Sequence, residues 1–118
     1  MYTHRPSWLR KFACAFRGIA VGIREQNSFY VHFPVTAAVL AAAWWLEVSR
    51  TEWCLLLLCI AGVVTCELFN SAIEHLAKAI TREENPHLRD ALDAASGAVL
   101  VAAMAAAGVG CLTLAANL

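Results

Sequence analysis

Hydrophobic and polar positions near the start of the chain follow a helical repeat. In residues 7–24 apolar side chains recur three and four apart, while Arg10, Arg17 and Arg24 fall seven apart on another face. This spacing predicts an amphipathic helix. A basic helix that also carries aromatic rings is typical of the membrane interface, where arginines meet lipid phosphates. The alternative is a helix packed on protein.

Three apolar stretches follow, at residues 31–48, 53–79 and 91–118. Each is long enough to cross the ~30 Å hydrocarbon core as a helix. The second stretch becomes polar from Glu67 onward, so we expect its helix to leave the bilayer without ending. We predict a loop from Thr81 to Asp90, because Pro86 biases the residue before it away from helix.

Composition supports lipid as the solvent. The chain is 60% hydrophobic and 15% charged, with a mean hydropathy of +0.60, whereas soluble domains carry about 25% charged residues. We therefore predict a single all-α membrane domain spanning residues 1–118, with an N-terminal amphipathic surface helix and three transmembrane helices. The last span is rich in Ala and Gly, which favours close helix packing or oligomerisation.

Lysine and arginine residues predict the orientation. Five of them, including Arg5, precede the first span, three flank the connection before the third span, and none follows the third span. Basic residues stay on the cytoplasmic side of membrane proteins. We expect a cytoplasmic N-terminus and a C-terminus on the far side.

One polar stripe follows the second span at helical spacing. Its members are Glu67, Asn70, Ser71, Glu74 and Lys78. The helical rise separates Glu67 from Glu74 by about 10 Å. An ionisable group near the bilayer centre costs ~2.5 kcal/mol or more, so Glu67 needs a compensating role. It either pairs with a polar neighbour and fixes packing, or accepts a proton from a hydroxyl that arrives through the lipid.

Further polar residues are expected on the same cytoplasmic side. They are Glu25, Gln26, Asn27, His32, Glu83, Glu84, Asn85, Arg89, Asp90 and Asp93. A magnesium-bound nucleotide needs one or two carboxylates while Mg²⁺ shares its phosphate oxygens. The chain contains neither GxxxxGK[ST] nor GxGxxG, so a nucleotide site would be of another design. We expect no nucleic-acid partner.

The stretch Glu67-Leu-Phe-Asn-Ser-Ala-Ile-Glu74, followed by Asp93 in Asp-Ala-Ala-Ser-Gly-Ala-Val-Leu, resembles the small prokaryotic diacylglycerol kinases. This family includes the undecaprenol kinases of Gram-positive bacteria. The resemblance extends over nearly the whole chain and takes in Phe16-Arg17-Gly18 and the His32 region. It implies a homotrimer in the bacterial inner (plasma) membrane, with active sites between protomers at the cytoplasmic interface. It also implies transfer of the ATP γ-phosphate to a lipid hydroxyl with Mg²⁺.

The resemblance assigns roles to individual positions. Glu67 matches the general base, Glu74 a metal-binding carboxylate, and Asn70 an amide of the motif. Four residues are expected near the nucleotide: Glu83, Asn85, Asp93 and Arg17. Gln26, His32 and Lys78 are expected to support the site.

Three positions depart from the family pattern. Gln26 stands where the family has a second metal-binding glutamate, and Glu25 could replace it only if the helix end shifts, because adjacent helical residues are rotated by ~100°. Lys78 replaces an aspartate, and Leu92 replaces a lysine that would contact phosphate. We expect Lys78 or Arg89 to supply that contact.

The leading hypothesis is a lipid kinase whose acceptor is diacylglycerol, with undecaprenol as the alternative. A second hypothesis is a non-catalytic membrane oligomer that has lost nucleotide binding through Gln26 and Leu92. A channel or transporter subunit is a weaker third, because the carboxylates gather at one interface and do not extend through the spans.

Overall fold

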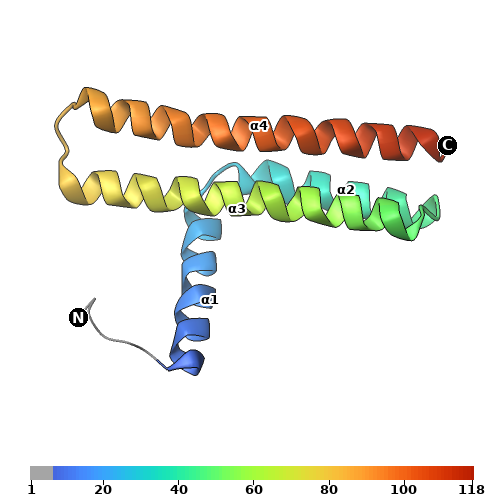
Figure 1. Ribbon diagram of the computed structural model, residues 1–118, viewed down its shortest axis with the longest axis horizontal. Helices are drawn as coiled ribbons and strands as arrows, with labels where there is room; N and C mark the ends of the chain where they lie inside the picture. Colours follow the sequence, from blue (N-terminus) through green and yellow to red (C-terminus); the bar gives the residue numbers. More distant parts are fainter. Residues whose placement is uncertain (1–6) are drawn as a thin grey trace.

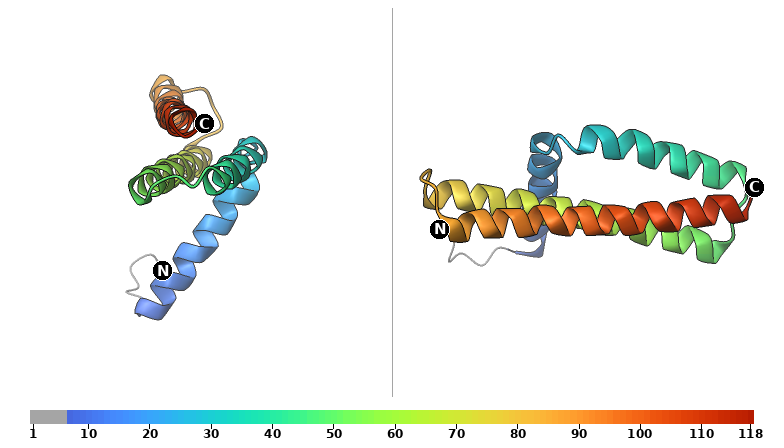
Figure 2. Two further views of the ribbon diagram at one scale, coloured as in Figure 1. Left: turned by 90° about the vertical axis from the view of Figure 1, so that its right-hand side faces the viewer. Right: turned by 90° about the horizontal axis from the view of Figure 1, so that it is seen from above.

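The computed structural model describes residues 7–118, so Arg5 lies outside the described part. In that part the chain forms four helices: α1 (Trp8–Glu25), α2 (Phe29–Trp45), α3 (Arg50–Ile80) and α4 (Pro86–Ala116). α3 and α4 lie side by side and antiparallel along the long axis, and α2 completes a three-helix bundle beside them (Figure 1; Figure 2). The all-α architecture predicted from the sequence is confirmed.

α1 lies across the bundle. It makes an angle of 103° with α2, and Figure 1 shows it projecting sideways from the middle of the molecule. Its C-terminal end meets α3 closely, because a Cβ atom on Gly22 would stand 2.4 Å from Leu68 Cδ2. Trp8, Phe12 and Phe16 remain exposed. This crosswise placement is the one expected of a helix that lies in the membrane interface.

Two helices meet the length and hydropathy required to cross a bilayer. α3 and α4 contain 31 residues each. α2 has 17 residues, which is the lower limit for a span at about 1.5 Å per residue. α1 and α2 pass the same test as a pair, but they are sharply bent at Gln26–Ser28. Two spans are therefore supported by α3 and α4, and the crossing of α2 stays a prediction.

Several helix ends differ from the sequence prediction, and the start of α4 shows the largest difference. α4 begins at Pro86, inside the stretch expected to be a loop, because Asn85 Oδ1 accepts hydrogen bonds from the N–H groups of His87 and Leu88. Proline suits the first position of a helix, where its missing N–H needs no partner. α2 ends at Trp45, and Glu47 adopts a positive φ of 54° in the turn before α3.

α3 starts with a capping box. Ser49 Oγ accepts a hydrogen bond from the N–H of Glu52, and the Glu52 carboxylate accepts one from the N–H of Ser49. This reciprocal arrangement satisfies two backbone donors that the first helical turn leaves open. It fixes the start of the helix that carries the polar stripe.

The buried core of the single chain is small. Ala43, Val48 and Leu56 form its centre where α2 meets α3. Large apolar side chains such as Leu58, Leu100 and Leu112 are exposed. Lipid or neighbouring protomers can cover these faces, and the homotrimer stays a prediction.

Candidate active site

Glu67 is the most deeply buried polar residue of the described chain, with 1% of its surface exposed. Ser28 Oγ donates a hydrogen bond to Glu67 Oε1 over 2.7 Å, and His32 Nε2 lies 3.1 Å from the same oxygen. A buried carboxylate is costly without such partners. Ser28 and His32 sit four residues apart at the start of α2, so one helix face presents both groups to Glu67.

Glu74, two helical turns further along α3, is held by two side-chain amides. Asn70 Nδ2 donates to Glu74 Oε1 over 2.7 Å, and Gln26 Nε2 donates to the same oxygen over 3.3 Å. Asn70 Oδ1 is buried and has no hydrogen-bond partner among the described residues. Gln26 directly follows α1, so the end of the surface helix reaches the polar stripe.

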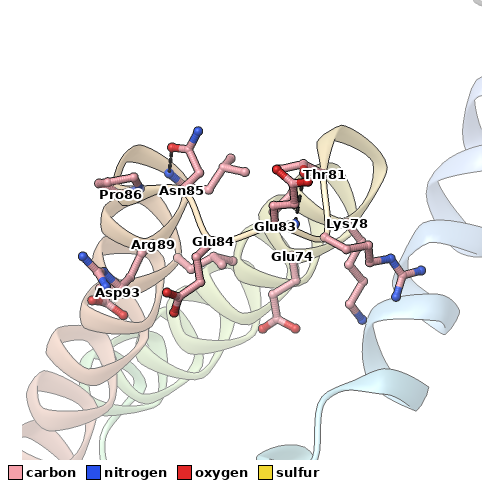
Figure 3. Close-up of a pocket in the computed structure, with 13 residues that line it drawn as sticks. Glu74, Lys78, Thr81, Glu83, Glu84, Asn85, Pro86, Arg89 and Asp93 are labelled. Atoms are coloured by element: carbon pink, nitrogen blue, oxygen red, sulfur yellow. Dashed lines mark hydrogen bonds between the residues drawn. The ribbon is translucent and has the colours of Figure 1, made fainter.

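A polar cavity of about 590 Å³ lies where α3, the following loop and the start of α4 meet. The sequence-predicted residues Glu74, Lys78, Glu83, Asn85 and Asp93 all line it. Figure 3 shows Glu84 between Glu74 on α3 and Asp93 on α4. Two further cations, Arg82 and Arg89, also line the cavity, beside Leu92. The fold thus brings together most of the positions expected near the nucleotide.

Two predicted site residues lie elsewhere. Glu25 forms a close contact with His75 Nε2, and Glu25 and Arg17 both line a separate crevice between α1 and α3. In residues 7–118 no group of three or more His, Cys, Asp or Glu side chains is placed to hold a metal ion. The metal role of Glu25 and the nucleotide contact of Arg17 therefore stay predictions.

Sequence reasoning missed Ser28 and His75. Ser28 precedes α2 in a short polar connection, and its spacing from His32 was the available signal. His75 follows Glu74 on α3, but only the fold shows that its ring meets Glu25. Both contacts join residues far apart in the sequence, so no local pattern contains them.

An apolar groove of about 300 Å³ leads away from Glu67. It runs between α2, α3 and α4 from His32 toward Leu56 and Leu114. Small residues of α4, such as Ala106 and Gly110, line it. His32 belongs both to this groove and to the hydrogen-bond network of Glu67. A hydrocarbon chain in the groove would therefore place its polar end beside the buried carboxylate.

Comparison with known proteins identifies the family. The family model described as "Prokaryotic diacylglycerol kinase" matches residues 13–114. The chain belongs to this family. The kinase is 37% identical over 105 residues to the undecaprenol kinase of Bacillus subtilis (strain 168), with 89% of this chain and 85% of that protein covered.

A second relative is the diacylglycerol kinase of Synechocystis sp. (strain ATCC 27184 / PCC 6803 / Kazusa). The two chains are 34% identical over 111 residues, and the match covers 92% of this chain and 63% of the relative's length. Both relatives and the family point to the same chemistry. The chain is an ATP-dependent membrane lipid kinase.

The donor set fits a divalent metal that arrives with a nucleotide. Glu74 would supply one carboxylate at the polar cavity, and the unpartnered Asn70 Oδ1 would supply a buried oxygen on the preceding turn. Mg²⁺ commonly takes one or two protein carboxylates and completes its shell with phosphate oxygens and water. Three acidic or His ligands are therefore not required here.

Proposed function

We propose that this kinase transfers the γ-phosphate of ATP to the hydroxyl of a membrane lipid, with Mg²⁺, at the cytoplasmic face of the bacterial plasma membrane. The observation that carries the proposal is the position of Glu67. This buried carboxylate lies between an apolar groove that starts at His32 and an amide-held carboxylate, Glu74, that lines a polar cavity. Lipid and nucleotide can therefore approach it from different sides.

Glu67 acts as the general base in this proposal. Ser28 and His32 both contact Oε1, so neither contact uses Oε2, which can accept the proton of the lipid hydroxyl. The two contacts hold the carboxylate in one orientation. A positioned base of this kind contributes about 10²–10⁴-fold to a rate.

The polar cavity receives the nucleotide phosphates. Lys78, Arg82 and Arg89 offer positive charge, and Glu74 with Asn70 Oδ1 would hold the metal ion. A bound Mg²⁺ supplies neutralisation of phosphate charge. Phosphoryl transfer depends mainly on such positioning and charge stabilisation, so the protein needs no covalent intermediate. Lys78 and Arg89 occupy positions from which they can replace the lysine lost at Leu92.

Diacylglycerol and undecaprenol are the two candidate acceptors. The groove contacts the carbons next to the hydroxyl, while the remaining chain can stay in lipid, so its apolar walls accept either molecule. The named activities of the two relatives divide in the same way. Diacylglycerol, the acceptor first expected from the sequence, and undecaprenol, the alternative acceptor, are therefore tested together.

The deciding experiment measures transfer of labelled phosphate from ATP to each lipid in mixed micelles with Mg²⁺. Glu67→Gln should lower kcat by about 10²-fold or more, because it removes the base and keeps the shape. Glu52→Gln is the matched control: it makes the same change at the opposite end of α3, where Glu52 takes part in a helix cap and accepts a hydrogen bond from Asn117, and it should retain wild-type activity. Equal activity of Glu67→Gln and wild type would exclude the proposed base. No labelled product on either lipid, from folded protein, would exclude both acceptors.

A further inference from the structure

A second cavity lies in the angle between α1 and α3, on the face of α3 that points away from the proposed active site. It measures about 850 Å³ and is lined by residues of both helices. Ala72, which lines it, follows Glu67 by five positions and is therefore rotated by about 140° around α3. We call this cavity the α1–α3 crevice. The proposed phosphoryl transfer makes no use of it.

The crevice changes from apolar to polar along α3. Leu68 and Phe69 line the part of the crevice nearer the apolar end of α3. Ser71 and His75 line the part nearer its polar, C-terminal end. α1 shows the same polarity, with Ile19 on its apolar face and Arg17 and Arg24 on its basic face. The cavity is therefore amphipathic across the membrane interface, which is the profile of a phospholipid rather than of a nucleotide.

Contacts between the helices orient the basic face of α1. Gly22 meets Leu68, whereas Glu25 meets His75, about two turns further along α3. Viewed down the axis of α1, Glu25 lies between Gly22 and the face that carries Arg17 and Arg24. Arg17 and Arg24 line the crevice from α1, about 140–160° around that helix from Gly22 and on the side of Glu25, so they stand at the rim of its polar end.

The charge balance of the crevice favours an anion. Its one carboxylate, Glu25, is engaged by His75. Among residues 7–118 no carboxylate forms an ion pair with Arg17 or Arg24. Guanidinium groups match phosphate oxygens with paired hydrogen bonds, and two of them one helical repeat apart would hold one phosphate from the same side.

We propose that the α1–α3 crevice binds an anionic phospholipid of the bilayer, with its phosphate on Arg17 and Arg24 and an acyl chain along Leu68 and Phe69. The bound lipid is distinct from the acceptor that reaches Glu67, because the two occupy different faces of α3. It would also fill the space that α1 and α3 leave between them on the N-terminal side of their contacts at Gly22 and Glu25.

Native mass spectrometry of the whole protein in detergent tests this site. Phosphatidylglycerol and phosphatidylcholine with the same acyl chains are titrated separately. We expect phosphatidylglycerol to bind at least tenfold more tightly, and Arg17→Gln/Arg24→Gln to remove that difference. The matched control Arg10→Gln/Lys11→Gln removes two charges from the exposed, distal part of the same helix and should keep it.

A third variant separates the crevice from general surface charge. Ala72→Trp keeps both arginines and places a bulky ring in the cavity beside Leu68, so it should also lower the affinity for phosphatidylglycerol at least tenfold. Full affinity in this variant would place the lipid elsewhere and overturn the proposal. The proposal would also be overturned if the two double variants lost the same affinity for phosphatidylglycerol, or if free glycerol phosphate displaced the lipid. Dissociation of an oligomer by Ala72→Trp, without loss of lipid, would show that a second copy fills the crevice.

Discussion

Gln26 gives Glu74 a neutral hydrogen-bond donor as its neighbour in this kinase. Its amide donates a hydrogen bond to Glu74 Oε1, at the position where the resembling family carries a glutamate. A neutral donor stabilises one carboxylate without any cation. A glutamate would instead place two like charges together, and such a pair is stabilised by a cation between them or by a proton on one of them. The glutamine thus favours the metal-free site.

Gln26→Glu should make the protein more dependent on Mg²⁺. We expect a lower melting temperature without the metal, recovery when Mg²⁺ is added, and a Mg²⁺ concentration for half-maximal activity that is roughly tenfold lower, equivalent to about 1.4 kcal/mol. Thermal unfolding and kinase assays over a Mg²⁺ series measure both effects. Gln26→Ala, which removes the hydrogen bond without adding charge, should not increase Mg²⁺ affinity. An unchanged Mg²⁺ requirement in Gln26→Glu would contradict this account.

Asn85 has two possible roles, and one pair of variants separates them. It caps α4 through its side-chain oxygen and also lines the polar cavity. Asn85→Ala should destabilise the protein by about 1 kcal/mol through loss of the cap. Asn85→Ser keeps a capping oxygen and should restore the melting temperature. If the KM for ATP stays raised in Asn85→Ser, the amide contacts nucleotide; if KM also recovers, the role is capping alone.

Sequence spacing predicted the stripe on α3 because all its members belong to one helix. The family resemblance then supplied the proposed roles of Glu67 and Glu74. Contacts made between helices could not be predicted in the same way. Ser28 and His75 have ordinary local surroundings in the sequence, and their partners come from other helices. The distance of Arg17 from the polar cavity likewise depends on the angle between α1 and α2, which no local pattern predicts.

At the scale of secondary structure, the end of α1 is the element that brings Gln26 to the stripe. Gly22 permits the approach, since any Cβ at this position would overlap the Leu68 side chain. Gly18, one turn earlier, has open space around it. Two glycines in the same helix therefore have different structural consequences.

Gly22→Leu should push α1 away from α3. We expect a loss of stability of about 1–3 kcal/mol from overpacking, together with lower kinase activity as Gln26 leaves Glu74. Gly18→Leu is the control, and it should retain stability because a residue with better helix propensity enters open space. Thermal unfolding and lipid phosphorylation measure both variants. Equal stability of the two variants would show that the Gly22 contact with Leu68 is not required.

Helix types and order were predictable from hydrophobic periodicity, whereas helix ends were less so. In the sequence Pro86 predicts an interruption of helix, but Asn85 caps the chain there and proline is the first helical residue. A proline has both properties, and only the preceding cap distinguishes them. The same segment is the one that closes the polar cavity.

At the scale of the whole molecule, three helices contribute to the hydrogen-bond networks of Glu67 and Glu74. Ser28 and His32 come from the start of α2, Gln26 from the end of α1, and the carboxylates from α3. α4 contributes the far wall of both the polar cavity and the apolar groove. The proposed site is therefore assembled by tertiary packing of one chain, and the predicted protomer contacts would add to it.

Because α3 is one unbroken helix, the position of Glu67 along it also sets the depth of this carboxylate in the membrane. One helix crosses the bilayer and carries Glu67, so the depth of the carboxylate below the headgroups depends on the thickness of the surrounding membrane. Hydrophobic mismatch in thick bilayers would submerge it, and thin bilayers would lift it away from the acceptor hydroxyl. In vesicles of phosphatidylcholines with increasing chain length, activity should pass through a maximum, whereas ATP affinity should vary little. A flat activity profile would show that α3 tilts to compensate, so that membrane thickness does not control this enzyme.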